Sequence, residues 1–539
     1  MKKIILLILP ALAIVCATAG QKNEWNTISP RQKLQAIEST INNYYVDTID
    51  EEMLVEAAIR GMTEQLDPHS IYSDKEETKE LTEPLDGNFS GVGIEFNMQN
   101  DTLYVVQTVA GGPSEKVGIL PGDRFIAVND TVIAGKGMKN TDIMKRLRGK
   151  KGTEVSITVV RRGVAEPIEF RVTRDDIPLY SIDAAYMVDD HTGYIRLSRF
   201  ARTSIDEFLE AEKNLKKKGM KQLILDLTDN GGGYLDIAAT IANQFLEKGE
   251  LIVYTQGRKQ PRREMNARGD GKMKEGRLVV MVNQFSASAS EILSGALQDW
   301  DRAVIVGRRT FGKGLVQHPV VFPDGTMLRL SIARYYTPSG RSIQKPYKQG
   351  GQEEYELDIL NRYNHGELES ADSVKFDESL KYTTLKTRRT VYGGGGIMPD
   401  VFVPVDTTSY SDFYRDIVAK GTLNNFVIKY VDTNRKQLES EYKDAKQFSE
   451  KFAVTDSMMN VLTADAEKDG VKYNEEQYKK SEPLMRSIIK ALIARDILDR
   501  GAYFMIANEN EPIYRKALLT INSPEYDKIL NNETATNAN

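Results

Sequence analysis

Five consecutive apolar residues, Leu278–Val282, are followed by a serine-rich turn and then by a stretch with helical periodicity. A short run without a polar face is typical of a strand buried on both sides, as in the parallel sheet of an α/β protein. From Ser286 onward the apolar residues recur at helical spacing, which predicts a helix directly after the turn. Upstream, a predicted helix at 204–217 precedes a predicted strand at 222–227. This alternation predicts an α/β core with much parallel pairing.

The serine-rich turn has two interpretations. Ser288 lies where the predicted helix begins, and the unpaired backbone N–H groups of a helix N-terminus can receive developing negative charge. A hydroxyl in this place suits a nucleophile. The same segment, Ser288-Ala-Ser-Glu291, also fits S-x-x-E, the pattern of a capping box with no chemical role. On this pattern alone, capping is the commoner explanation.

A lysine between two glycines favours the nucleophile. Lys313 lies in the loop after the next predicted strand, with Gly312 and Gly314 on either side. Glycines let the backbone approach a neighbour without a Cβ clash. A buried lysine loses its proton more easily than an exposed one, and it can then act as a base.

The same loop resembles a nucleotide-binding motif, which we reject. Residues 307–313 read G-x-x-x-x-G-K, but position 314 is glycine, where a Walker A sequence needs a hydroxyl for Mg²⁺. Residues 315–322 then look like a strand, where a P-loop continues as a helix.

Three glycines at 231–233 separate a predicted strand from a helical stretch. Glycines allow backbone amides to approach a substrate oxygen closely, which predicts an oxyanion hole. A plain strand–helix turn explains the run equally well, and the residues alone leave both interpretations open.

Three motifs resemble the catalytic core of the C-terminal processing peptidases, also called tail-specific proteases (peptidase family S41). They are Ser-Ala-Ser-Ala-Ser-Glu at 286–291, Gly-Ala-Leu-Gln-Asp at 295–299 and Thr-Phe-Gly-Lys-Gly-Leu-Val-Gln at 310–317. The resemblance implies that Ser288 is the nucleophile, Lys313 the general base, and Gln317 the residue that orients the lysine. It also implies a crotonase/ClpP-like α/β protease core with an inserted PDZ domain and helical N- and C-terminal regions.

An oxyanion hole is a further implication of the resemblance. Its donors would be the N–H of Ala289 and the N–H of a glycine in the 231–233 run. This chain has Thr228-Asp-Asn-Gly231 where relatives carry an Arg and a Pro, so the choice between Gly232 and Gly233 stays open. Asp299 lies three helical turns beyond Ser288, too far for direct action, so we expect it to anchor a loop.

Short strands and glycine turns at 86–175 are similar to a PDZ domain. Such a domain adds a chain end as an extra strand at a sheet edge and holds its terminal carboxylate with backbone N–H groups. Val92, Gly93 and Ile94 match the carboxylate loop, and residues 141–147 match the groove helix. The alternative is that Gly91 and Gly93 serve only a turn.

The beginning of the chain predicts a secretory signal peptide. Two lysines at positions 2 and 3 precede an apolar stretch at 4–15 and the cleavage pattern Ala17-Thr-Ala19, too short for a membrane span. We therefore expect an exported protein, periplasmic in a Gram-negative cell. Lipidation of Cys16 is less favoured, because bulky Val15 precedes it. A chain cut after Ala19 has no cysteine, which excludes disulfides, thiol catalysis and cysteine zinc sites.

Composition excludes other classes of function. The formal net charge is −5 with no basic block, so nucleic-acid binding has no electrostatic support. No later stretch approaches a membrane-spanning length. We expect no metal and no cofactor, because the histidines lack ligand spacing: His69, His191, His318 and His365. We expect His69 to cap or pack, since the family resemblance assigns it no catalytic role.

We expect the following organisation: signal peptide 1–19, N-terminal helical region 20–85, PDZ domain 86–175, protease core 176–405 with an insertion at about 346–392, and C-terminal helical region 406–539. This predicts an exported Ser–Lys endopeptidase whose partners are proteins with exposed, mainly apolar C-terminal tails. An adaptor protein and a homo-oligomer are both compatible with the sequence. The competing class is an inactive PDZ scaffold that binds protein C-termini.

Overall fold

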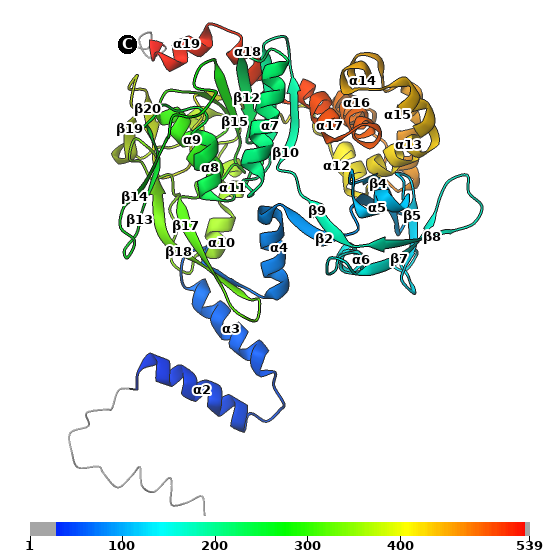
Figure 1. The fold of residues 1–539 in the computed structure, drawn as a ribbon. Coiled ribbons are helices and arrows are strands. Elements are labelled where there is room, and N and C mark those ends of the chain that lie inside the picture. The colour runs from blue at the N-terminus through cyan, green and yellow to red at the C-terminus, as the bar shows by residue number, and fades with distance from the viewer. Residues whose placement is uncertain (1–27, 534–539) are drawn as a thin grey trace, which may run out of the picture. The chain divides into compact units, whose positions relative to one another are not determined.

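The computed structural model describes residues 28–533. The chain divides into two compact units between Gln65 and Leu66. The predicted signal peptide and Cys16 lie outside the described residues. The first unit contains the helices α2 (Pro30–Tyr44) and α3 (Glu51–Glu64), shown in dark blue in Figure 1. A capping box between Ser29 and Gln32 begins α2.

A six-stranded sheet forms the centre of the second unit. Its order is β10-β11-β12-β15-β16-β21, and only the β10–β11 pairing is antiparallel. The strands are β10 (Ile182–Met187), β11 (Thr192–Leu197), β12 (Gln222–Asp226), β15 (Leu278–Val282), β16 (Val304–Gly307) and β21 (Val401–Phe402). The α/β core with mostly parallel pairing is therefore confirmed.

Helices cover both faces of this sheet, which explains its continuous apolar strands. Leu223 and Leu225 of β12 pack on one face, and Ile224 between them packs on the other. Figure 1 shows α7, α8 and α9 in green and α18 and α19 in red around these strands. Their bounds are α7 (Ser204–Lys217), α8 (Leu235–Ala242), α9 (Ala289–Asp299), α18 (Pro512–Ile521) and α19 (Glu525–Leu530).

A buried ion pair fixes the end of α9. The Asp299 carboxylate accepts a hydrogen bond from Arg341 Nη2 at 2.7 Å and another from the backbone N–H of Ser339 at 2.9 Å. Both partners of the pair are fully buried. The expected loop-anchoring role of Asp299 is thus confirmed.

A second sheet contains the strand that follows the Lys313 loop. Strand β18 runs through its centre and pairs with β1, β13 and β17, and β13 in turn pairs with β14. The strands are β1 (Ile71–Ser73), β13 (Leu251–Gln256), β14 (Arg263–Asn266), β17 (Leu315–Val321) and β18 (Met327–Tyr336). Because β17 is a strand and not a helix, the rejection of a P-loop is confirmed.

Residues 94–173 form the sheet expected of a PDZ domain, with order β3-β4-β5-β7-β8 and β6 beside β5. Its strands are β3 (Ile94–Gln99), β4 (Thr102–Thr108), β5 (Arg124–Val128), β6 (Thr131–Val132), β7 (Glu154–Val160) and β8 (Ile168–Thr173), with helices α5 (Pro113–Val117) and α6 (Asn140–Leu147). Helix α4 (Lys75–Asp86) precedes it. The antiparallel pair β2 (Asn88–Gly91) and β9 (Asp175–Pro178) connects it to the core.

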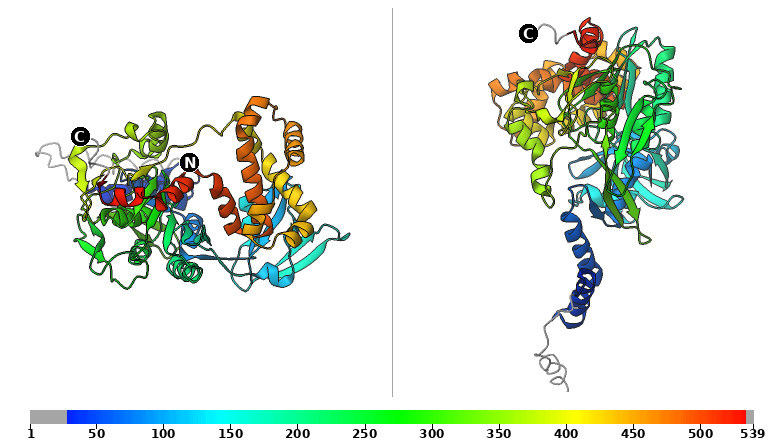
Figure 2. Two further views of the ribbon diagram at one scale, coloured as in Figure 1. Left: turned by 90° about the horizontal axis from the view of Figure 1, so that it is seen from above. Right: turned by 90° about the vertical axis from the view of Figure 1, so that its left-hand side faces the viewer.

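The helices between residues 412 and 507 pack on one another, and some of them contact the PDZ sheet. Tyr104 and Val106 of β4 form a buried cluster with Ile428, and Gln107 donates to the backbone carbonyl of Arg495 at 2.6 Å. The left-hand view of Figure 2 shows these helices, yellow to orange, beside the cyan strands. They are α12 (Asp412–Ala419), α13 (Thr422–Glu441), α14 (Ala445–Lys451), α15 (Asp456–Lys468), α16 (Glu475–Ile497) and α17 (Arg500–Ala507).

The segment between β18 and β21 has its own short elements: α10 (Gln352–Glu356), α11 (Asp358–Asn364), β19 (Lys381–Thr383), β20 (Thr390–Tyr392) and the 3₁₀ turns η1 (Ala371–Ser373) and η2 (Glu378–Leu380); η3 (Asn508–Asn510) follows α17. Among residues 28–533, none of the helices combines the length and apolar character needed to cross a bilayer.

Candidate active site

The candidate nucleophile lies on a strained turn at the carboxyl end of β15. Ser288 has φ 56° and ψ −112°, a left-handed backbone that a residue with a Cβ rarely adopts. Two neighbouring hydroxyls hold the turn: Ser286 Oγ donates to Leu227 O at 2.7 Å, and Ser290 Oγ donates to Asn230 O at 2.8 Å. The turn is therefore fixed to the loop after β12.

Glu291 connects this turn to the lysine loop. Its buried carboxylate accepts hydrogen bonds from the backbone N–H groups of Ser288 at 2.8 Å, Gly312 at 2.7 Å and Lys313 at 2.9 Å, and from Thr310 Oγ1 at 2.5 Å. Burial raises the pKa of Glu291, although these bonds oppose the shift. The contact between Glu291 and the Ser288 N–H that the S-x-x-E pattern predicts is present. The same carboxylate also holds the backbone of Lys313.

A tyrosine hydroxyl makes a second connection between the two segments. Tyr335 Oη lies 3.0 Å from the carbonyl oxygen of Ser288 and 2.5 Å from that of Lys313. Tyr335 belongs to β18 and is buried. Ser288 and Lys313 are therefore joined through both their N–H and their C=O groups.

The side chain of Lys313 is held by Gln317. Lys313 Nζ donates to Gln317 Oε1 at 3.0 Å, and Gln317 Nε2 donates to the backbone carbonyl of His69. Burial, with the charge of Arg329 as the next cause, lowers the pKa of Lys313 to about 8, against weaker opposing effects of two carboxylates. The arrangement thus makes the amine lose its proton more easily than an exposed lysine does, and it fixes the direction of the amine.

The glycines beside Lys313 permit a close backbone approach. A Cβ on Gly314 would lie 2.9 Å from the backbone nitrogen of Gln344, and one on Gly312 would lie 3.0 Å from Lys345 Cβ. Real Cβ atoms essentially never approach another heavy atom within 3.0 Å, and distances of 3.0–3.4 Å are tighter than most Cβ contacts. The predicted reason for these two glycines is therefore confirmed.

The glycine run packs directly against the nucleophile turn. A Cβ on Gly232, whose φ is 106°, would lie 2.8 Å from Ser288 Cβ and 3.1 Å from Ala289 N. The Gly232 amide already donates to Asn230 Oδ1 at 2.9 Å. Among the described residues, the amides of Gly233 and Ala289 have no acceptor within hydrogen-bond distance. Among residues 28–533, these two N–H groups therefore have no hydrogen-bond partner.

Substitution of Gly232 tests this close approach. We expect Gly232→Ala to lower kcat/KM about a hundredfold, because the added methyl group displaces the turn that carries Ser288. Gly249→Ala is the matched control, since Gly249 also has a positive φ, 87°, but has open space around its Cβ position. Peptidase rates of the two folded variants measure the effect. Equal rates would contradict the packing of Gly232 against the nucleophile.

Three residues that the sequence analysis did not single out hold the glycine loop. Asn230 is fully buried, and its carbonyl accepts the N–H of Ala287 at 3.0 Å. Arg196 Nη1 donates to Asp226 Oδ2 at 2.6 Å and to Thr228 Oγ1 at 2.7 Å. Asn283 Oδ1 accepts the N–H of Asp229, another residue with positive φ. Only the run of turn-forming residues signalled this loop, and no local pattern pointed to Arg196.

A cavity of about 210 Å³ opens beside Ser288. Its walls are mostly apolar and come from α4, α8, α9, β17 and β18: Leu81, Leu85, Leu235, Ile292, Leu315, Val316, Pro319 and Met327. Gly233, Gln317 and Arg329 also line it. The candidate nucleophile therefore faces a space that fits a modest apolar side chain.

The candidate tail-binding residues lie far from Ser288 in the sequence, in the PDZ sheet. Val92 and Gly93 precede β3, and Ile94 is its first residue. Strand β3 is an edge strand that pairs only with β4 within its sheet. Among the described residues, the amides of Val92 and Gly93 donate to no other group. An edge strand that begins with free N–H groups has the geometry for capturing an extended chain end.

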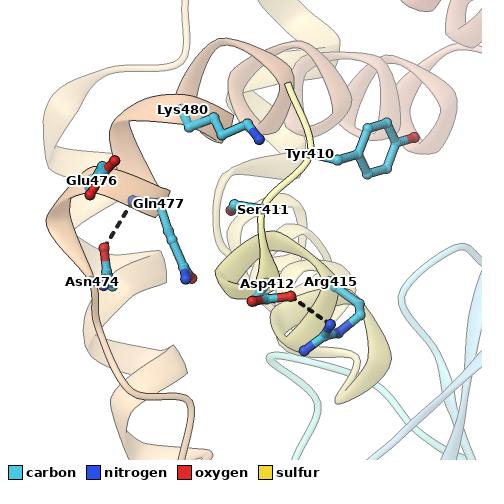
Figure 3. Close-up of a pocket in the computed structure, with 8 residues that line it drawn as sticks. All are labelled: Tyr410, Ser411, Asp412, Arg415, Asn474, Glu476, Gln477 and Lys480. Atoms are coloured by element: carbon cyan, nitrogen blue, oxygen red, sulfur yellow. Dashed lines mark hydrogen bonds and ion pairs between the residues drawn. The ribbon is translucent and has the colours of Figure 1, made fainter. Parts of the chain in front are cut away.

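A larger hollow of about 570 Å³ lies in the C-terminal helices, and Figure 3 shows its lining. Asp412 pairs with Arg415 at 2.6 Å, and Asn474 caps the N–H of Gln477 at 3.0 Å. These side chains thus serve the local structure of the helices. Within residues 28–533, no group of His, Cys, Asp and Glu side chains has the arrangement of a metal site.

The α/β core, the serine turn and the PDZ sheet define the class of PDZ-containing serine peptidases. The sequence matches Peptidase family S41 at 191–353, PDZ domain at 90–172, Activating protease CtpB N-terminal domain at 14–77, and Family of unknown function (DUF8443) at 413–499. The chain belongs to the carboxy-terminal processing protease family and is a serine-type endopeptidase.

Two relatives illustrate this membership. Carboxy-terminal processing protease CtpB of Bacillus subtilis is 33% identical over 443 residues, which cover 81% of this chain and 90% of the relative. Carboxy-terminal-processing protease of Bartonella bacilliformis is 37% identical over 342 residues, which cover 62% of this chain and 77% of the relative. Among solved structures, the photosystem II D1 C-terminal processing protease is 27% identical, with a TM-score of 0.33 and coverage of 59% of this chain and 91% of that chain.

Proposed function

We propose that the protein is an exported endopeptidase that uses Ser288 and Lys313 to cleave proteins recognised by their C-terminal tails. The observation that carries the proposal is the double connection between the two residues, through Glu291 and Tyr335. Family membership favours an enzyme over an inactive scaffold.

The proposed reaction begins with attack of Ser288 Oγ on the carbonyl carbon of the scissile peptide. The hydroxyl proton passes to the uncharged Nζ of Lys313, which Gln317 holds. The N–H groups of Ala289 and Gly233 stabilise the tetrahedral oxyanion; we prefer Gly233 to Gly232, whose amide is occupied by Asn230.

Collapse of this intermediate breaks the carbon–nitrogen bond. Lys313 returns its proton to the leaving amine, and an ester to Ser288 remains. Water, deprotonated by the same lysine, then hydrolyses the ester and restores the free serine. Neither step needs a metal or a cofactor. The apolar cavity beside Ser288 supports a preference for small or modest apolar side chains at the cleavage site.

We propose that the PDZ sheet selects the substrate. The free edge of β3 and the N–H groups of Val92, Gly93 and Ile94 would bind a terminal carboxylate and add the tail as a strand. Capture of the tail away from Ser288 implies cleavage some distance inward. The proposal of export rests on the signal-peptide pattern at the beginning of the sequence. An adaptor protein and a homo-oligomer are compatible with the proposal and are not required by it.

Tail selection is tested with one unfolded substrate carrying a free apolar, an amidated or an Asp-Asp end. The mature chain from residue 20, without any added metal, should cleave the first fastest and release internal fragments. Amidation removes the anion, and an apolar groove cannot solvate two aspartates. Rates and product masses are measured. Equal rates with products shortened one residue at a time would overturn the proposal.

A further inference from the structure

Tyr355 lies on α10, in a segment to which the sequence analysis assigned no role. Only 5% of its surface is exposed. Its hydroxyl lies 2.9 Å from His69 Nε2 and 3.3 Å from Gln344 Nε2. Two hydrogen bonds to a buried hydroxyl restrict its position and the positions of both partners.

Each of these two partners also makes a hydrogen bond to a residue beside Lys313 or to the residue that holds its amine. The backbone carbonyl of His69 accepts the Gln317 Nε2 donor, and Gln344 Oε1 accepts the backbone N–H of Gly314 at 2.8 Å. One hydroxyl therefore supports the residue after Lys313 and the side chain that holds its Nζ.

The donor fixes the direction of one of these two hydrogen bonds, and the tautomer of His69 decides the other. The amide nitrogen of Gln344 can only donate, so the Tyr355 oxygen accepts from it. The Tyr355 hydrogen is then available to His69 Nε2 when His69 carries its proton on Nδ1; in the other tautomer His69 Nε2–H donates to the Tyr355 oxygen. Burial, reinforced by the charge of Lys313, lowers the pKa of His69 to about 3, so the ring is neutral and can accept.

Packing holds the tyrosine in place. Its ring makes edge contacts with the rings of His69 and Phe311, with centroids 5.1 Å and 5.8 Å away. Lys345 Nζ lies 3.9 Å from the centre of the Tyr355 ring and bonds to Asp358 Oδ2 at 2.9 Å. The short helix α10 is thus fixed against the loop that carries the candidate base.

We propose that Tyr355 is a positioning residue of the peptidase reaction, which acts through His69 and Gln317 to direct the amine of Lys313. The proposal rests on the proposed Ser–Lys function. On this proposal, the segment that carries α10 supplies the Tyr355 hydroxyl, which helps to hold the proposed general base in place.

Tyr355→Phe tests this role, because it removes the hydroxyl and keeps the ring. We expect kcat to fall tenfold to a hundredfold, as is typical of a misdirected catalytic group, with KM changed less than twofold. Tyr347→Phe is the matched control: Tyr347 lies in the same segment, and within the described residues its hydroxyl makes no hydrogen bond. It should retain the activity of the unaltered protein.

A double-mutant cycle separates positioning from general damage. If Tyr355 acts through Gln317, Tyr355→Phe should cause little further loss in a Gln317→Ala background. Multiplicative losses, or an unchanged kcat in Tyr355→Phe, would overturn the inference. Failure of the proposed function looks different, because the unaltered protein and Ser288→Ala would then have equal rates. Circular dichroism and thermal melting confirm that each variant is folded.

Discussion

Ser288→Ala is expected to lower kcat/KM by at least about 10³-fold, since removal of a nucleophilic serine leaves only binding and oxyanion stabilisation. The variant should fold, because alanine accommodates the left-handed turn no worse than serine does. Loss of a helix cap costs only about 1 kcal/mol. Cleavage of an unfolded protein, followed by gel and mass spectrometry, measures the loss.

The matched control is Ser294→Ala on the same helix. The Ser294 hydroxyl only donates to the Ser290 carbonyl at 2.7 Å within α9. Its loss should cost about 1 kcal/mol of stability and leave the rate within a few-fold. Substantial turnover by Ser288→Ala would contradict the nucleophile assignment, whatever the control shows.

Lys313→Arg is expected to be as inactive as Lys313→Met, with losses of at least about 10³-fold, because a guanidinium stays protonated and cannot accept the serine proton. The two variants should differ in stability. The folded-state pKa of Lys313 is about 8, below its ordinary value of 10.5. Below pH 8 the lysine is charged in both states, and burial of that charge costs about 3 kcal/mol.

Lys313→Met should therefore unfold at a higher temperature than the unaltered protein at pH 7. The gain should shrink as the pH rises from 8 towards 10.5, because the folded lysine is then already neutral. Lys313→Arg should show no such gain. Denaturant unfolding at pH 7 and pH 10 measures the difference. A Met variant that is less stable at pH 7 would contradict a desolvated amine.

The same pKa sets the pH dependence of activity. We expect kcat/KM to rise as the pH rises through about 8, where Lys313 loses its proton. Arg329→Gln should move this rise in kcat/KM to higher pH, since the positive charge of Arg329 contributes to the lowered pKa of Lys313. A profile that falls through pH 8, or one unchanged in Arg329→Gln, would contradict this assignment.

The sequence predicted the elements of the core well, because local patterns determine them. The run Leu278–Val282 lacks a polar face, and the strand is buried on both sides of the sheet. Residues 204–217 have helical periodicity, and they form α7. The glycines at 312 and 314 predicted a close approach, and the segment at Gln344 and Lys345 provides it.

The supports of the site could not be predicted, because the sequence carries no pattern for contacts between distant segments. Glu291 looked like half of a capping box, yet it also accepts the N–H groups of the lysine loop. Arg196 is an ordinary strand residue in the sequence. Tyr355 lies 286 positions from His69, its hydrogen-bond partner. Only the folded chain shows these pairings.

The bond between Gln317 and the His69 carbonyl joins positions 248 residues apart in the sequence. A contact between positions so far apart requires a long loop to close, which costs conformational entropy. The direction of the Lys313 amine, which Gln317 holds, therefore depends on the distant segment that carries His69. The support of the proposed base therefore depends on two segments that are far apart in the sequence, and not on the serine and the lysine alone.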